Sequence, residues 1–444
     1  MKTCVLAAAV AIGVGACGGG GGSDSPAGPS GSLPLPCVAF QSAATNLVAG
    51  DTNGERDIFL RGVNGGPTLR INRSSDGAEA VGGMSLSPAV TPDGRFVAFH
   101  SSATNLVPGD TNGVVDVFVH DVEAGATTRV SVDSSGAEGN GSSVFPAITP
   151  DGRYVAFHSW APNLVAGDTN GELDVFLHDR QTGQTVRVSV DSGGGQALFD
   201  SSSASISTDG RYVAFTSYAP DLVPGDSNGL ADIFVRDLQT GTTERVSLDG
   251  AGGQAVGGDS YEPVLSSDGR YVAFHSWASN LVAGDTNADA DVFVHDRQTG
   301  ATTRVSVSSA GAEAAGGPSY GPSISADGRY VAFDSTATNL VAGDTNGYAD
   351  VFVHDRQTGE TVRISLGQGG AESAGGDSIF ASLSPDGRYV AFESTATNLV
   401  AGDGNGKSDI FVYDRETGVT VRVSVSSEEA EGNGHSNDPA TSRP

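Results

Sequence analysis

A motif that returns at a nearly constant interval constrains the fold of this chain more than any other feature of its sequence. One copy reads Asn-Leu-Val-Ala-Gly-Asp-Thr-Asn-Gly-x-x-Asp-Val-Phe, from Asn163 to Phe176. Seven copies occur, 58 or 59 residues apart, and the aspartates that open their turns are Asp51, Asp110, Asp168, Asp226, Asp285, Asp344 and Asp403. So regular an interval is typical of an array in which each repeat buries its apolar faces against its neighbours.

Each repeat is predicted to contain four β-strands and no helix. In one repeat the four extended segments are Pro146–Thr149, Arg153–Ser159, Asp174–His178 and Thr185–Val190. The last segment alternates, which predicts that Val186, Val188 and Val190 share one face. No segment has the apolar period of a helix over a useful length. Four antiparallel strands per repeat in a closed circle form a β-propeller.

Two segments carry a resemblance to a known family. They are Ser-Pro-Asp-Gly-Arg-Tyr-Val-Ala-Phe at Ser384–Phe392 and Asp-Ile-Phe-Val-Tyr-Asp at Asp409–Asp414. Matching turns occur at Asp93, Asp151, Asp209, Asp268, Asp327 and Asp386. This pattern resembles the repeat of TolB-type (WD40-like, PD40-type) β-propellers and covers everything after about Cys37. The chain departs from that repeat by its long loop, and the resemblance does not reach the additional N-terminal domain of TolB.

The two ends of the repeat region predict how the ring closes. Residues Cys37–Phe40 begin abruptly at a second strand, and Pro439–Ser442 matches the first strand at Pro146–Thr149. We therefore expect residues 37–444 to form an all-β, seven-bladed propeller of four-stranded antiparallel blades. The C-terminal strand would join the N-terminal blade, and this closure would leave no exposed sheet edge.

The N-terminus is predicted to be a targeting segment followed by a tether. Residues 1–16 combine Lys2 with the apolar run Val5–Val14, and Val-Gly-Ala precedes Cys17. This resembles a bacterial lipobox, which implies cleavage before Cys17 and attachment of lipid there; an ordinary signal peptide with a chance cysteine is the alternative. Residues 17–36 are rich in Gly, Ser and Pro and predict a flexible tether. We expect a lipid-anchored, extracytoplasmic protein of the bacterial cell envelope, periplasmic or at the surface.

Charge and cysteine usage narrow the range of partners. The formal net charge of −29 argues against a phosphate-binding surface and so against nucleic acid as a partner. Of the three cysteines, Cys4 leaves with the signal peptide and Cys17 is predicted to carry lipid, so no internal disulfide is available. Cys37 occupies a position that holds Phe96 or Tyr154 in other repeats, which predicts a buried apolar side chain.

The long loop is the candidate for metal chemistry. Its Asp, Asn and second Asp offer hard oxygen ligands around a glycine, as calcium requires. The candidate ligands are Asp51, Asn53, Asp57, Asp110, Asn112, Asp116, Asp168, Asn170, Asp174, Asp226, Asn228, Asp232, Asp285, Asn287, Asp291, Asp344, Asn346, Asp350, Asp403, Asn405 and Asp409. The alternative is a turn without metal, because Asn-Gly is itself a strong turn signal and the loop is shorter than familiar calcium loops.

Some positions vary between repeats and are candidates for function. The residue after Val-Ala-Phe is Gln41, His100, His158, Thr216, His275, Asp334 or Glu393. Packed sheets lie ~10 Å apart, so equivalent histidines cannot share one metal ion, and His158 and His178 should end their strands at opposite edges. Trp160 and Trp277 lie in loops, where they would either pack locally or stack on a sugar or peptide.

We expect a binding or scaffolding module without catalysis, monomeric, with a protein or glycan as its ligand. No nucleophile motif or phosphate loop stands out. The alternative is a cell-envelope lyase or hydrolase with its site in the central funnel. That alternative requires distinctive polar residues on the innermost strands, which read as small and bland, for example Pro-Ala-Val-Thr at 88–91.

Overall fold

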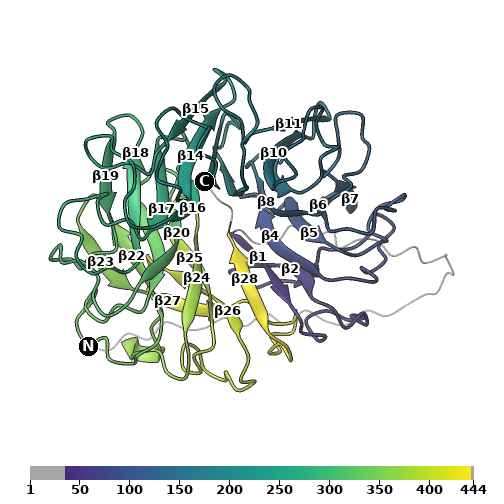
Figure 1. Cartoon of the computed structure of the whole chain (residues 1–444). Helices are drawn as coiled ribbons and strands as arrows, with labels where there is room; N and C mark the ends of the chain where they lie inside the picture. The colour runs from purple at the N-terminus through teal and green to yellow at the C-terminus, as the bar shows by residue number, and fades with distance from the viewer. Residues whose placement is uncertain (1–35, 442–444) are drawn as a thin grey trace, which may run out of the picture. The chain divides into compact units, whose positions relative to one another are not determined.

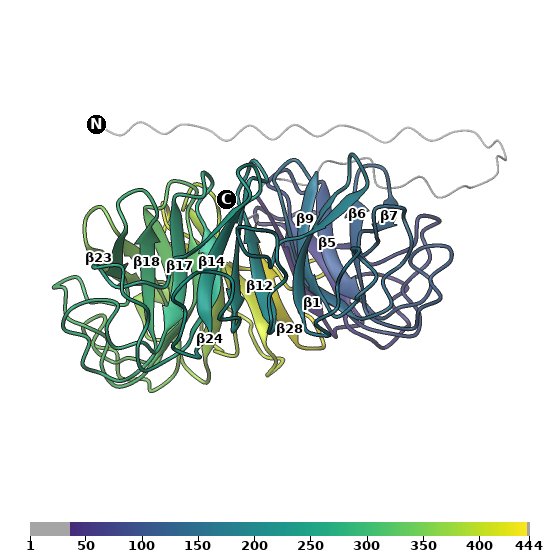
Figure 2. The ribbon, with the colours of Figure 1, turned by 45° about the horizontal axis from the view of Figure 1, so that its top comes forward.

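The computed structural model describes residues 36–441; the predicted signal peptide, Cys17 and residues 17–35 of the tether lie outside this part. The described residues form 28 β-strands in seven four-stranded antiparallel sheets, arranged as blades around a centre (Figures 1 and 2). The predicted seven-bladed propeller is therefore confirmed. The one helix of residues 36–441 is a 3-10 turn, η1 (Gln368–Gly370), and no helix there is long and apolar enough to cross a membrane.

The blades are numbered 1 to 7 from the one that contains β1, and each uses its strands in the same order from the centre outward. The innermost strands are β28 (Ser436–Ala440), β4 (Ser85–Val90), β8 (Ser143–Ile148), β12 (Ser201–Ile206), β16 (Ser260–Leu265), β20 (Ser319–Ile324) and β24 (Ser378–Leu383). The second strands are β1 (Cys37–Ser42), β5 (Phe96–Ser101), β9 (Tyr154–Ser159), β13 (Tyr212–Ser217), β17 (Tyr271–Ser276), β21 (Tyr330–Ser335) and β25 (Tyr389–Ser394).

The third and fourth strands lie farther from the centre. The third strands are β2 (Asp57–Gly62), β6 (Asp116–Asp121), β10 (Asp174–Asp179), β14 (Asp232–Asp237), β18 (Asp291–Asp296), β22 (Asp350–Asp355) and β26 (Asp409–Asp414). The fourth, outermost strands are β3 (Leu69–Arg70), β7 (Ala126–Arg129), β11 (Gln184–Arg187), β15 (Thr242–Arg245), β19 (Ala301–Arg304), β23 (Glu360–Arg363) and β27 (Val419–Arg422).

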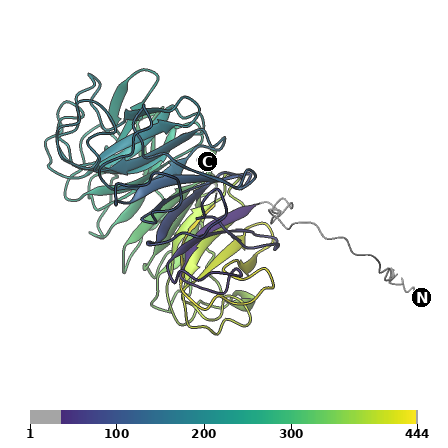
Figure 3. The same ribbon diagram turned by 90° about the vertical axis from the view of Figure 1, so that its right-hand side faces the viewer.

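The ring closes where the sequence predicts. Blade 1 has the order β28-β1-β2-β3, so the yellow C-terminal part of the chain lies beside the purple N-terminal part (Figure 3). Ala39 of β1 pairs with Ala440 of β28. One apolar cluster joins blade 1 to blade 7, with Val38 and Phe40 packed among Ile410 and other residues of the last blade. The C-terminal strand thus completes the blade that the N-terminal strand begins.

Two predicted strands are corrected by the structure. The innermost strand of blade 3 begins three residues before Pro146, at Ser143. Its fourth strand ends at Arg187. Val186 is exposed while Val188 is buried, so these two valines do not share one face as predicted. The chain leaves the ladder there because Ser189 turns inward and its Oγ accepts a hydrogen bond from the backbone N–H of Val175 (3.1 Å).

The core lies within and between the blades. In every blade a phenylalanine of the second strand stacks on one of the third, as Phe157 does on Phe176 with ring centroids 6.0 Å apart. Seven apolar clusters fill the seven interfaces between neighbouring blades. Cys37 lies in one of them, where burial raises the pKa of its thiol to about 12, which confirms its predicted apolar role.

In blades 3 to 7 the Asp-Gly turn packs against the blade before it. Asp151 accepts hydrogen bonds from the hydroxyl of Thr149 (2.6 Å) and from the backbone N–H of Arg153 (3.0 Å). Gly152 has a φ of 71°, and a Cβ at this position would lie 2.2 Å from the ring of Phe96 in blade 2. The glycine is therefore required twice, for the turn and for the close approach of two blades.

Candidate functional site

The structure brings the predicted loop ligands together around an arginine. In blade 3, Nη1 of Arg187 lies 3.2 Å from Oδ1 of Asp168 and 3.3 Å from Oδ2 of Asp174. Asn170 donates its side-chain N–H to Asp174 (3.1 Å) and to the backbone carbonyl of Ala197 (2.9 Å). We call this arrangement of two aspartates, an asparagine and an arginine the loop cluster.

All seven blades contain a loop cluster. The central arginines are Arg70, Arg129, Arg187, Arg245, Arg304, Arg363 and Arg422. Five clusters hold a third carboxylate beside the arginine or the loop, and these are Glu79, Glu138, Glu313, Glu372 and Glu431. In blades 3 and 4 the neutral Gln196 and Gln254 take this place, hydrogen-bonded to Thr169 and Ser227 of the loop. Sequence analysis identified both aspartates but missed the arginine, which follows the second aspartate by 13 residues.

The hydrogen bonds of the clusters support the turn alternative. Oδ1 of Asn170 accepts the backbone N–H of Glu172 (3.3 Å), as in an Asx turn. The guanidinium supplies positive charge between the two aspartates. Burial still raises the pKa of Asp51 and of Asp403 to about 6. Calcium binding stays a prediction; among the described residues, three ligand atoms lie within 4.8 Å of one another only at Asp403, Asp409 and Glu431.

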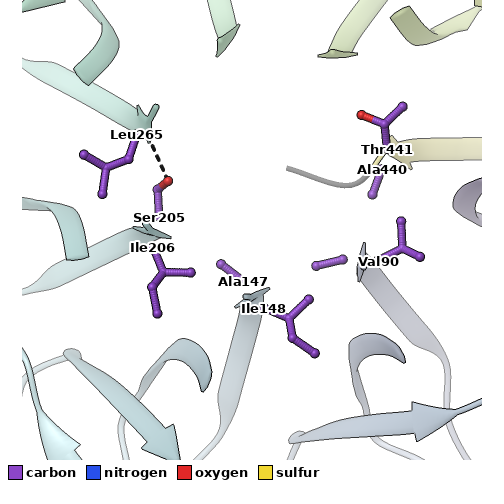
Figure 4. A pocket seen from close by; sticks show the side chains of 9 residues that line it. Val90, Ala147, Ile148, Ser205, Ile206, Leu265, Ala440 and Thr441 are labelled. Carbon is purple, nitrogen blue, oxygen red and sulfur yellow. Dashed lines mark hydrogen bonds between the residues drawn. The ribbon is translucent and has the colours of Figure 1, made fainter. Parts of the chain in front are cut away.

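A second candidate site lies at the centre of the ring, where the innermost strands form a funnel. Its narrow end is lined by small apolar residues such as Ala147 and Ile148 and encloses about 10 Å³ (Figure 4). There the backbone N–H of Leu265 donates to Oγ of Ser205 in the preceding blade (3.0 Å). The wide end, which we call the funnel mouth, has a volume of about 410 Å³, within the range of ligand pockets.

Each blade contributes one residue, at an equivalent position, to the lining of the funnel mouth. Every innermost strand has a β-bulge there, between the two parts of its ladder with the second strand. All seven residues have positive φ, from 49° to 58°, and they are Ser87, Phe145, Ser203, Glu262, Gly321, Phe380 and Asp438. Only glycine adopts this conformation without strain, and such strain is concentrated at functional sites. We call this the bulge position.

Behind the bulge position lies the variable position that follows Val-Ala-Phe, here called the wall position. In four blades its side chain accepts the bulge N–H of the next blade: Gln41 from Ser87 (3.0 Å), His100 from Phe145 (3.3 Å), Asp334 from Phe380 (3.2 Å) and Glu393 from Asp438 (3.3 Å). Burial lowers the pKa of the wall histidines His100, His158 and His275 to about 4, so they are neutral.

The histidines of the wall do not meet those of the third strands. His158 pairs with Val175 and His178 pairs with Val155, at opposite ends of the same two strands. His178 instead shares a hydrogen bond between its Nδ1 and the hydroxyl of Thr185 (2.9 Å). The predicted separation of these two histidines is confirmed.

The bulge residues were missed by sequence analysis, which expected bland innermost strands. That expectation is wrong because it began each strand at the proline, one residue after the bulge. A signal was present: Ser87, Phe145, Glu262 and their equivalents break a repeat whose following residues hardly change. In a ring of similar blades, such departures converge on the centre.

The sequence matches no protein-family model and no curated protein. Similar solved structures include TolB from Acinetobacter baumannii (15% identity, 81% of each chain, TM-score 0.41). Others are a prolyl endopeptidase structure (14%, 88% of this chain and 50% of that one, 0.54) and a puromycin-hydrolyzing peptidase of Mycobacterium tuberculosis (12%, 88% and 52%, 0.51). The chain thus spans about half the length of these peptidases. At these identities the similarity shows the fold alone, and the fold predicted from the TolB-type resemblance is confirmed.

Proposed function

We propose that this protein is a lipid-anchored, extracytoplasmic binding module of a bacterial cell envelope, and that its ligand enters the funnel mouth. One observation carries the proposal. The bulge position holds residues of five different types in the seven blades, and all seven residues line one cavity of about 410 Å³. Because the bulge and its positive φ recur in every blade, the variety of the side chains at this position, and not the backbone conformation, is what points to a ligand.

The anchor and the address rest on residues 1–36. The sequence Val-Gly-Ala-Cys at 14–17 and the Gly-, Ser- and Pro-rich tether support lipid attachment at Cys17. The variant Cys17→Ser should move the protein from the membrane fraction to the soluble fraction. If the variant still sediments with membranes, anchoring through this cysteine is wrong.

Ligand capture by the funnel mouth is tested by cross-linking the tagged protein in its own envelope and purifying what is attached. The matched variant is Ser87→Phe combined with Ser203→Phe, which narrows the mouth. Phenylalanine already occupies the same position as Phe145 and Phe380, so the fold should accept both changes. We expect the double variant to lose the captured ligand.

The control places the same side chain outside the funnel. Thr128 is exposed on the outermost strand of blade 2, so Thr128→Phe should fold and leave capture unchanged. Equal capture by the funnel variant and by wild type would contradict binding in the funnel mouth.

The alternative of a lyase or hydrolase has one observation in its favour. Burial raises the pKa of Asp334 to about 7, a value suited to a general acid or base. Asp334 is only 7% exposed, however, and Gly321 lies in front of it: a Cβ on Gly321 would be 3.0 Å from Oδ1 of Asp334. This position behind the cavity lining favours binding over catalysis. Cleavage of a captured ligand by wild type and not by Asp334→Asn would instead support the enzyme.

A further inference from the structure

Three consecutive blades carry an aromatic residue on the rim of the funnel. The residue directly after the second strand is Trp160 in blade 3, Tyr218 in blade 4 and Trp277 in blade 5, which we call the aromatic arc. The same position holds Ala43, Ser102, Thr336 and Thr395 in the other four blades. Trp160 and Tyr218 are 51% and 43% exposed, so most of the arc is available to a ligand.

The arc adjoins the funnel mouth. The ring of Trp277 lies 6.0 Å from that of Tyr261 and 5.5 Å from that of Tyr320, and Tyr218 hydrogen-bonds Tyr261 through the two hydroxyls. Tyr261 and Tyr320 directly precede Glu262 and Gly321 at the bulge position. Trp277 therefore packs locally, as one of the two alternatives for the tryptophans predicts, while Trp160 presents its ring to solvent.

The same three blades also depart from the others at the wall position. Four wall residues accept the bulge N–H of the next blade, as described above. In blades 3, 4 and 5 the corresponding atoms are Nδ1 of His158, the hydroxyl of Thr216 and Nδ1 of His275. All three atoms are buried and have no hydrogen-bond partner among the described residues, although Nδ1 of His275 lies 3.6 Å from Oε2 of Glu262.

His158 is the one of these three that lines the funnel mouth. It is 5% exposed, and its low pKa keeps it neutral, so the unpartnered Nδ1 can accept a hydrogen bond. A buried polar atom without a partner is costly, and most have one. A ligand hydroxyl that reached the mouth would supply the missing donor.

The charge of the funnel mouth selects against anions. The charged residues that line it within the described part of the chain are Glu262 and Asp438, and no lysine or arginine is among the lining residues. The protein as a whole has a formal charge of −29. An acidic polysaccharide would therefore be repelled.

The backbone of the mouth is unsuited to an extended peptide that adds as a strand. Such peptides need a continuous row of N–H and C=O groups at a sheet edge. Here every innermost strand is interrupted by its bulge. In five blades the next residue is a proline, which has no N–H: Pro88, Pro146, Pro263, Pro322 and Pro439.

We propose that blades 3 to 5 form a subsite for a neutral oligosaccharide, in which sugar rings stack on the aromatic arc and a sugar hydroxyl donates to Nδ1 of His158. This inference rests on the proposed function and names its ligand class. Aromatic faces suit the C–H faces of sugar rings, and the buried acceptor suits their hydroxyls.

The test uses the tryptophans themselves, because the chain contains two and both belong to the arc. Neutral oligosaccharides of glucose, xylose, mannose, galactose and N-acetylglucosamine are titrated into the full chain while tryptophan fluorescence is followed. We expect at least one of them to give a saturable change that salt does not weaken, because no charge pairs form. Polygalacturonate and an oligolysine peptide are titrated in parallel and should give none.

Two pairs of variants assign the response to the subsite. Trp160→Ala should weaken binding about tenfold, as expected for one lost aromatic contact. Alanine occurs at the same position as Ala43, so the fold accepts it, and Thr395→Ala in blade 7 is the matched control without effect. His158→Leu should weaken binding, whereas His158→Gln should retain it, because Gln41 shows that glutamine fits a wall position and can accept.

Three results would overturn the inference, and they separate it from the proposed function. If oligolysine binds, with an affinity that falls as the salt concentration rises, the ligand is cationic and the funnel mouth still binds it. A second result would be that no neutral oligosaccharide changes the fluorescence, while cross-linking captures a protein that the mouth-narrowing variant fails to capture. That result would contradict the sugar subsite but support binding in the funnel mouth. Neutral-sugar binding that Trp160→Ala and His158→Leu both leave unchanged would remove the subsite from blades 3 to 5.

Discussion

The loop clusters and the funnel mouth are built by the same seven repeats, yet the clusters repeat the same groups in every blade while the mouth varies between blades. In each cluster an arginine joins two aspartates, as Arg187 joins Asp168 and Asp174. At the bulge position serine, phenylalanine, glutamate, glycine and aspartate all occur. Repetition marks groups that every blade needs in order to fold, and departure from it marks groups that one ligand needs.

The two regions also differ in what they contribute to stability. The clusters pair buried carboxylates with an arginine and hold the long loops to the outermost strands. The funnel mouth holds residues at positive φ and leaves Nδ1 of His158 without a partner among the described residues. Each blade thus keeps the residues that stabilise the fold apart from the residues that would contact a ligand. Mutations in the two regions should therefore have different consequences.

The largest expected effect concerns the blade that is split between the chain ends. Deleting residues 435–444 removes β28, which exposes the edge of β1 and part of the cluster that joins blades 1 and 7. We expect a loss of several kcal/mol or aggregation, because an open ring has an unpaired edge. Deleting residues 18–32 should change the melting temperature little. Equal melting temperatures of the two truncations would contradict closure by β28.

A smaller loss is expected when a loop cluster loses its arginine. Arg187→Met leaves Asp168 and Asp174 buried without a cation, which should cost about 3–5 kcal/mol in urea unfolding. Arg129→Met in blade 2 should cost more, because Glu138 adds a third carboxylate where blade 3 has Gln196. An equal or smaller loss in blade 2 would contradict this account of the clusters.

These clusters show what the sequence could and could not predict. The aspartates, the turns and the seven-fold ring follow from local patterns of Gly, Asp and alternating apolar residues. The convergence of Arg187 on the loop does not, because it depends on the fourth strand turning inward after only four residues. The funnel mouth was missed for a related reason: a bulge shifts the register of the strand, and no residue type requires it. Only the variation among repeats pointed there.

Within the wall position, two substitutions should respond to pH with opposite signs. Burial raises the pKa of Asp334 from 3.8 to about 7, with Glu262 and Asp377 adding repulsion. The folded state then holds the proton more tightly, so wild type loses stability relative to Asp334→Asn as the pH rises through this range, by up to a few kcal/mol.

For His158 the stability depends on pH with the opposite sign. Burial lowers the pKa of His158 from 6.5 to about 4, so the unfolded state binds the proton more tightly between these values. Wild type should lose stability relative to His158→Gln as the pH falls through them, by up to a few kcal/mol. Urea unfolding of the three proteins at about pH 5 and about pH 8 measures both slopes. Parallel pH profiles would show that these groups are not buried as described.

Replacing a bulge residue with glycine should increase the stability of the folded state. Ser203 has a φ of 55°, and the left-handed conformation costs a non-glycine residue about 1–2 kcal/mol. Ser203→Gly should stabilise the chain by about 0.5–1 kcal/mol after the greater flexibility of glycine in the unfolded state is included. Gly321→Ser should have the reverse effect, increased by the contact of its Cβ with Asp334. Melting temperatures that rank these variants in the other order would show that the bulges are not strained.

The smallest expected effect is that of calcium on the wild-type protein. The guanidinium of each loop cluster lies close to both of its aspartates, so added calcium would have to displace it. We expect the same melting temperature in chelator and in millimolar calcium, and no heat of binding. A rise in calcium clearly larger than in magnesium would establish the calcium alternative, because binding to the folded state alone stabilises it by mass action.

The variant Arg422→Met makes this comparison decisive. In blade 7 the carboxylates of Asp403, Asp409 and Glu431 offer three ligand atoms within 4.8 Å of one another, and Arg422 contacts all three residues. Without the arginine these carboxylates repel one another, and calcium should then restore part of the lost stability to the variant although it does nothing for wild type. If calcium raises the melting temperature of wild type and variant equally, Arg422 does not occupy the position that calcium would take.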